Sequence, residues 1–126
     1  MDGVSLSLPM PPSVNALWRA RRGASGKPQF YLDRRYATWK RVADNIIMAT
    51  RPKPRIRGHF AIYIVLDDRK RRGDADNRAK ALLDTLQRAG VIEDDKLANH
   101  VSIGWGPANG CHVSIVSIPG EKARAA

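Results

Sequence analysis

The stretch FAIYIVLDDRKRRGDADNRAKALLDTLQRAG, residues 60–90, decides the fold. Its first seven residues, Phe60 to Leu66, are apolar on both faces of an extended chain, which is typical of a strand in the middle of a covered sheet. From Asp76 the apolar residues recur at intervals of three and four, so we expect an amphipathic helix from Asp76 to Ala89. Gly90 supplies the stop signal just beyond that helix.

The rest of the chain predicts four further elements. Alternating residues around Leu6 predict a strand, and the spacing of apolar residues predicts a helix over residues 34–50 with Asp33 as its cap. Two more strands are expected, one holding Val101, Ile103 and Trp105 and one over residues 111–118. The fold class is therefore α+β, with a mixed sheet of about four strands and two main helices in the order β-α-β-α-β-β. We expect one domain over residues 1–126, with a mobile basic loop at 19–28 and a frayed tail at 120–126.

The charge points to a polyanionic partner. Lys and Arg number 22 against 12 Asp and Glu, a formal net charge of +10. Nucleic acid is the commonest such partner, although a basic surface kept for solubility stays open. The residues expected to contact DNA are Arg19, Arg21, Arg22, Lys27, Arg69, Lys70, Arg71 and Arg72.

The single cysteine, Cys111, fits a reducing compartment and excludes an internal disulfide. It lies in an alternating apolar segment, so we expect a buried thiol rather than a nucleophile. No stretch approaches the roughly 18 apolar residues that span a bilayer. We therefore expect a soluble, cytoplasmic protein with no membrane partner and, since no phosphate-cradling glycine loop is present, no small-molecule cofactor.

The acidic residues concentrate around the predicted second helix. Asp74 and Asp76 are one residue apart and would point the same way from an extended backbone. Asp94 and Asp95 follow the helix, and they reach its N-terminal end only if the next strand runs back beside it. Converging carboxylates repel one another, and a divalent cation such as Mg²⁺ offsets that repulsion. An EF-hand is excluded because the segment lacks the required glycine at the sixth loop position. A zinc site is excluded because the cysteine and histidines do not have the spacing of zinc ligands.

Lys80 lies one turn after Asp76 and has two interpretations. It could stabilise a phosphate in the transition state or orient the attacking water. It could equally form an i,i+4 ion pair with Asp76 or Asp84, and the spacing alone leaves both open. Asp84 can pair as easily with Arg88, so we expect Asn77, Asp84 and Asp94 to have at most a supporting role.

The pattern Asp74-x-Asp76-Asn77-x-x-Lys80-x-x-x-Asp84-x-Leu86, followed by Ala89-Gly90 and Asp94-Asp95, resembles the RusA family of Holliday junction resolvases. The opening Leu8-Pro9-x-Pro11-Pro12-Ser13-x-Asn15 is also similar to that family's opening, whereas residues 96–105 match it less well.

This resemblance implies a homodimeric, Mg²⁺-dependent endonuclease, for which Mn²⁺ could substitute, that nicks symmetric strands of a four-way DNA junction. It also implies that Asp74, Asp76 and Asp95 bind the metal and that Lys80 is catalytic. The dimer would pair through a sheet edge or through the apolar helix faces. A non-catalytic DNA-binding module, whose acids only pair with nearby arginines, and a metal-dependent ribonuclease are the alternatives.

Overall fold

The computed structural model describes residues 3–13, 18–22, 28–32 and 34–119. Its centre is a four-stranded sheet in the order β1-β6-β4-β5. These strands are β1 (Gly3–Leu8), β4 (Phe60–Asp67), β5 (Ala98–Gly106) and β6 (Cys111–Ser117). β6 pairs antiparallel with both β1 and β4, whereas β4 and β5 are parallel. The predicted α+β class with a mixed four-stranded sheet is confirmed.

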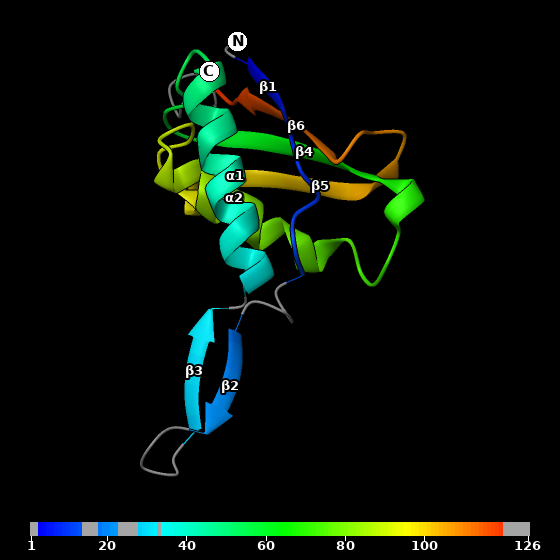
Figure 1. The fold of residues 1–126 in the computed structure, drawn as a ribbon. Coiled ribbons are helices and arrows are strands. Elements are labelled where there is room, and N and C mark those ends of the chain that lie inside the picture. Colours follow the sequence, from blue (N-terminus) through cyan, green and yellow to red (C-terminus); the bar gives the residue numbers. More distant parts are fainter. Residues whose placement is uncertain (1–2, 14–17, 23–27, 33, 120–126) are drawn as a thin grey trace.

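Two helices, α1 (Arg34–Thr50) and α2 (Ala79–Arg88), lie over one face of this sheet (Figure 1). α1 has the predicted bounds, and its buried residues Tyr36, Trp39, Ala43 and Ile47 recur at helical spacing. Asp33, expected to cap it, lies outside the described residues. Neither of these helices is long and apolar enough to cross a membrane.

The core lies between the helices and the facing side of the sheet. β4 contributes Phe60, Ile62, Ile64 and Leu66, none more than 2% exposed, and α2 contributes Leu82 and Leu86. β4 is central, as predicted, but the expectation that both its faces are covered is wrong at Tyr63, which is 45% exposed. The reason is that both helices lie on the same side of the sheet, so the opposite side has no layer of helices against it.

A separate antiparallel hairpin precedes α1. It pairs β2 (Trp18–Arg22) with β3 (Pro28–Leu32) in a two-stranded sheet of its own. The loop expected over residues 19–28 is therefore in part a hairpin, because residues 19–22 pair with the strand that follows. Residues 23–27 and the expected tail at 120–126 lie outside the described residues.

The connection from β4 to β5 determines where the acidic residues before and after α2 lie. After β4 the chain forms two short 3-10 turns, η2 (Asp68–Lys70) and η3 (Asp76–Arg78), and then α2, so the predicted helix begins at Ala79 rather than at Asp76. A third 3-10 turn, η4 (Asp95–Leu97), leads into β5. Because β4 and β5 are parallel, α2 must carry the chain back along the sheet. The residues before α2 and those after it therefore lie at opposite ends of that helix (Figure 1).

Candidate functional site

Asp74 and Asp76 lie on the exposed turn that leads into α2. Gly73, with a φ of +72°, turns the chain into this segment, and both aspartates are exposed. The residue between them, Ala75, has φ −63° and ψ −43°, which is helical rather than extended. The expectation that the two carboxylates point the same way from an extended backbone is therefore wrong, because residues two apart in a helical turn do not share a face.

Asp95 lies at the other end of α2. Its backbone N–H donates to Oε1 of Gln87, in the last turn of the helix, at 2.9 Å. At about 1.5 Å of rise per residue, Gln87 is roughly 12 Å along the axis from Ala79, and η3 lies beyond that point again. Among the described residues no three His, Cys, Asp or Glu side chains come close enough to hold a metal ion. Within one chain, Asp95 therefore does not join Asp74 and Asp76, and the three do not form one ligand set for Mg²⁺.

None of these three carboxylates has an ion-pair partner in the part of the chain that the structure describes, whereas other acids are paired. Asp67 pairs with Arg69, Asp84 with Lys80 and Asp44 with Arg88, with N···O distances of 3.0, 3.6 and 2.8 Å. Asp74, Asp76 and Asp95 are therefore open to solvent or to a ligand, as are Asp68 and Glu93, which also have no ion-pair partner among the described residues.

Lys80 adopts the ion pair that spacing allowed, with Asp84 rather than Asp76. Its side chain is 62% exposed, so the pair lies at the surface. Arg88 bonds to Asp44 of α1 instead of Asp84 and ties the two helices together. Asp94 caps η4, since its carboxylate accepts from the backbone N–H of Lys96 at 2.9 Å, and Asn77 is half-buried beside Asp76.

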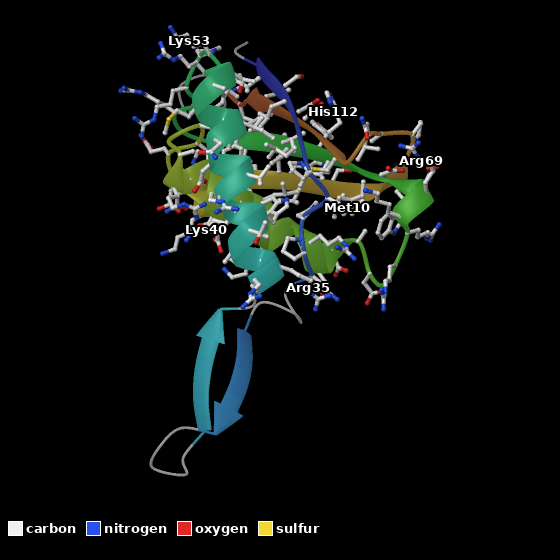
Figure 2. The ribbon with its side chains drawn as sticks, viewed as in Figure 1. Met10, Arg35, Lys40, Lys53, Arg69 and His112 are labelled. Carbon is white, nitrogen blue, oxygen red and sulfur yellow. The ribbon has the colours of Figure 1, made fainter. Side chains whose placement is uncertain are left out.

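In the basic run after β4, Arg69 forms an ion pair with an aspartate, whereas the three basic residues after it are exposed to solvent. Arg69 donates from Nε and Nη2 to the two carboxylate oxygens of Asp67, both at 3.0 Å, and its backbone N–H donates to Oδ1 as well. These bonds hold the pKa of Asp67 below its usual range and raise that of Arg69. Lys70, Arg71 and Arg72 are exposed around the same turn, and Figure 2 shows Arg69 at its tip.

Sequence reasoning missed the role of Arg78. Its guanidinium donates to the backbone carbonyls of Pro11 and Arg72 and lies 5.8 Å from the ring centre of Trp105. Burial, and secondarily the charge of Arg72, hold the pKa of Arg78 below its usual range. Arg78 thereby fastens the proline-rich opening to the acidic turn. Its acceptors are backbone carbonyls, which leave no signature in the sequence.

A cavity of about 430 Å³ opens beside the acidic turn. Its lining combines basic side chains with proline and tryptophan, and Figure 2 labels two members, Met10 and Arg35. The lining residues are Met10, Pro11, Pro12, Ser13, Arg35, Trp39, Arg72, Gly73 and Arg78. Basic groups around an apolar floor suit a phosphate and the sugar or base attached to it.

A larger cavity of about 520 Å³ lies between the C-terminal ends of α1 and α2, far from Asp74. Its only acid is Asp44, which Arg88 already neutralises. The smaller cavity, next to Asp74 and Asp76, is therefore the functional candidate.

The buried thiol expected at Cys111 is confirmed. Cys111 is inaccessible to solvent, and desolvation raises its pKa to about 12. It therefore remains a protonated thiol and takes no part in the candidate site.

Comparison with known proteins identifies relatives over most of the chain. The family model described as Endodeoxyribonuclease RusA matches residues 9–116. The crossover junction endodeoxyribonuclease of Enterobacteria phage HK97 is 32% identical over 104 residues, which is 82% of each chain. The enzyme of the same name from Escherichia coli K12 is 38% identical over 98 residues, 75% of this chain and 76% of its own, and that of Shigella sonnei gives the same values.

Proposed function

This chain belongs to the RusA family of endodeoxyribonucleases, and we propose that it resolves four-way (Holliday) junctions by paired symmetric nicks in DNA recombination and repair. The relatives are named for cleavage of crossover junctions, and the match over residues 9–116 spans the acidic turn, α2 and the strands β4 and β5. The observation that carries the proposal is the pair of exposed carboxylates, Asp74 and Asp76, on the turn that borders a basic cavity. A binding module whose acids only neutralise nearby arginines would have Asp74 and Asp76 paired as Asp67 is.

The basic residues gather and position the DNA. Lys70, Arg71 and Arg72 are exposed beside the acidic turn, where they can hold the phosphates that flank the scissile bond. Arg69 contributes positive charge there, but two nitrogens of its guanidinium group already donate hydrogen bonds to Asp67. On the hairpin we assign DNA contacts to Arg19, Arg21 and Arg22, which lie in β2, and to Lys27, which is outside the described residues.

Lys80 is the proposed catalytic cation. A surface i,i+4 ion pair is worth only a few tenths of a kcal/mol. Lys80 can therefore exchange Asp84 for a phosphate oxygen at little cost and stabilise the charge that develops during cleavage. Asn77, Asp84 and Asp94 keep supporting roles: Asp84 holds Lys80 in the absence of DNA, and Asp94 shapes the turn that presents Asp95.

We assign the reaction a need for a divalent cation, Mg²⁺ or Mn²⁺, and assign Asp74, Asp76 and Asp95 to it. Carboxylate oxygens are the donors that such hard cations prefer. Within the described part of one chain these three carboxylates do not come together. A homodimer is part of the proposal, since a four-way junction presents two equivalent scissile phosphates to a two-fold protein.

The test is cleavage of a labelled synthetic four-way junction. Wild-type protein with Mg²⁺ should give paired, symmetry-related nicks, which EDTA should abolish. Asp76→Asn should abolish nicking while junction binding persists. Asp68→Asn removes a nearby exposed acid of the same size and should leave cleavage intact.

Junction binding without nicks in Mg²⁺ or Mn²⁺ would instead establish the binding module. An RNA hairpin cut more readily than the junction would establish the ribonuclease. Continued nicking by Asp76→Asn would remove that residue from the site.

A further inference from the structure

We propose that the cavity beside the acidic turn takes up one nucleotide next to the scissile phosphate, with its base unstacked from the duplex. The inference rests on the proposed function for the position of the cut. It goes beyond that function by assigning a second binding site, the form of DNA that fills it, and a physical source of preference for branched over linear DNA.

The wall of the cavity and the acidic turn are parts of one short segment. Arg72 and Gly73 line the cavity and immediately precede Asp74. Arg78 lines it as well and follows Asp76 by two residues. Both ends of the segment that carries the two carboxylates therefore lie in the cavity wall. A phosphodiester held at these carboxylates would have its neighbouring nucleotide at the opening of the cavity.

The lining suits a nucleotide in both charge and polarity. Three arginines line the cavity, and none of the described residues around it is acidic. Arg35 and Arg72 are exposed, so their guanidinium groups can contact the phosphates on either side of the nucleotide. Bases of any sequence pack against apolar and aromatic side chains through their flat faces. The apolar part of the lining consists of Met10, Pro11, Pro12 and Trp39.

Arg78 has an unused hydrogen-bond donor in this wall. Its two terminal nitrogens donate to the carbonyls of Pro11 and Arg72. Its Nε–H is buried and has no acceptor among the described residues. A buried donor without an acceptor is unfavourable and uncommon in folded proteins. A nucleobase carries carbonyl oxygens and ring nitrogens, either of which would supply the acceptor that Arg78 lacks.

The size of the cavity and the cost of unstacking both favour a base from a branch point. The volume of about 430 Å³ lies within the roughly 300–1,000 Å³ of small-molecule sites, which leaves room for a nucleobase. Taking a base out of a linear duplex costs its stacking and pairing energy, and this cost is least where the base is already unpaired or poorly stacked. Stacking is interrupted at the branch point of a junction. The cavity would therefore favour branched DNA without reading its sequence.

A neighbouring cavity provides a matched control position. It has a volume of about 400 Å³ and shares Arg35 and Trp39 with the first cavity, but its lining contains no residue of the acidic turn. Val42 is part of this second lining and is 37% exposed on α1. A bulky side chain at Val42 therefore changes the surface of α1 without obstructing the cavity beside the acidic turn.

Fluorescence of 2-aminopurine, a base analogue that brightens when it is unstacked, tests the capture of a base. The analogue replaces single bases on both sides of the cut in a synthetic four-way junction. The wild-type protein is added in EDTA, so that binding proceeds without cleavage. Fluorescence should rise several-fold at one position next to the scissile phosphate and should not change several nucleotides away.

Affinity for two forms of DNA tests the source of the preference. Binding to the junction and to a linear duplex of the same sequence is measured at one salt concentration, because phosphate contacts make affinity depend on salt. Met10→Trp fills the cavity and should weaken junction binding roughly tenfold, the order expected for one packed base, while duplex binding stays unchanged. Val42→Trp should change neither affinity. Circular dichroism and thermal unfolding establish whether both variants are folded.

Arg35→Ala keeps the inference testable if Met10→Trp does not fold. Arg35 is exposed in the first turn of α1 (Figure 2), so its loss should leave the core intact. This variant should reduce both the fluorescence rise and the affinity for the junction more than the affinity for the duplex. Arg41→Ala removes the same charge from an exposed position of α1 outside the cavity and should lower both affinities equally.

The outcomes separate this inference from the proposed function. If the wild type nicks the junction while no base beside the cut brightens, nucleotide capture is refuted and the proposed function survives. A fluorescence rise that Arg35→Ala leaves intact, together with a junction preference that Met10→Trp leaves intact, places the unstacked base elsewhere and also refutes it. A wild type that neither prefers nor nicks the junction refutes the proposed function instead.

Discussion

Replacement of Arg78 by alanine should destabilise the protein far more than replacement of Arg71, although both guanidinium groups lie over Trp105. The distances to the ring centre are 5.8 Å for Arg78 and 6.0 Å for Arg71. Only Arg78 also donates to two backbone carbonyls, those of Pro11 and Arg72. Arg71→Ala is therefore a matched control that removes the ring contact alone.

The structure sets the expected size of the difference. A cation over an aromatic ring at an exposed site contributes about 0.5–1 kcal/mol. Hydrogen bonds from a charged donor contribute about 1.5–3 kcal/mol each. We take the lower end because the bond to Arg72 is exposed and because burial disfavours the charged form of Arg78. Arg71→Ala should thus cost up to about 1 kcal/mol and Arg78→Ala about 3 kcal/mol.

Urea and thermal unfolding followed by circular dichroism would measure both variants. For a chain of this length, about 3 kcal/mol corresponds to a fall in Tm of roughly 10 °C. Arg78→Lys should recover less than half of the loss, because an ammonium group cannot reproduce the planar fork that reaches both carbonyls. Equal losses in Arg78→Ala and Arg71→Ala would show that the carbonyl bonds contribute nothing and that the proline-rich opening is held by packing alone.

Three further predictions concern stability and reactivity. Gly110→Ala should destabilise the fold by more than Gly73→Ala in urea unfolding. Both glycines have positive φ, but only at Gly110 would a Cβ also clash with a backbone oxygen, that of Leu8. Equal losses in the two variants would show that backbone strain alone causes the destabilisation. Cys111 should resist a thiol-specific chromogenic reagent at pH 8 in the folded protein and react at once in urea; rapid labelling of the native state would contradict its burial and its pKa of about 12. Because the folded-state pKa of Asp67 is depressed, its contribution to stability is present above the ordinary value of 3.8 and is lost as the pH falls through the lower folded value. Asp67→Asn should therefore flatten the fall in unfolding free energy between pH 5 and pH 2, and an unchanged profile relative to Asp68→Asn would exclude this source.

Periodicity made the main sheet and the helices predictable. The alternation around Leu6 and the helical spacing in residues 34–50 each record which face is buried, and burial is what the structure shows there. The sequence of the β2–β3 hairpin shows no such periodic pattern. Its first strand, WRARR, has no β-branched residue and alternates only weakly, so composition favoured a loop. Pairing across a turn stabilises such strands through contacts that a single strand's sequence does not encode.

The sequence shows which acids lie close to α2 along the chain, but it does not show how they are placed relative to one another. Asp74 and Asp76 are exposed in the structure, but the helical conformation of Ala75 between them is a local choice that an alternating pattern does not reveal. The position of Asp95, in contrast, could be predicted from the order of the elements. A strand, a helix and a strand joined by short connections form a crossover unit with parallel strands, which places the two ends of the connection apart. Asp95 therefore had to lie across the length of α2 from Asp76.

The length of α2 then becomes the feature that links fold to mechanism. A helix of ten residues separates the two halves of the acidic set by a distance that no side chain spans. The same crossover makes β5 an edge strand whose two ends lie beside those two halves. Among the described residues of one chain, the three carboxylates therefore do not gather at one place.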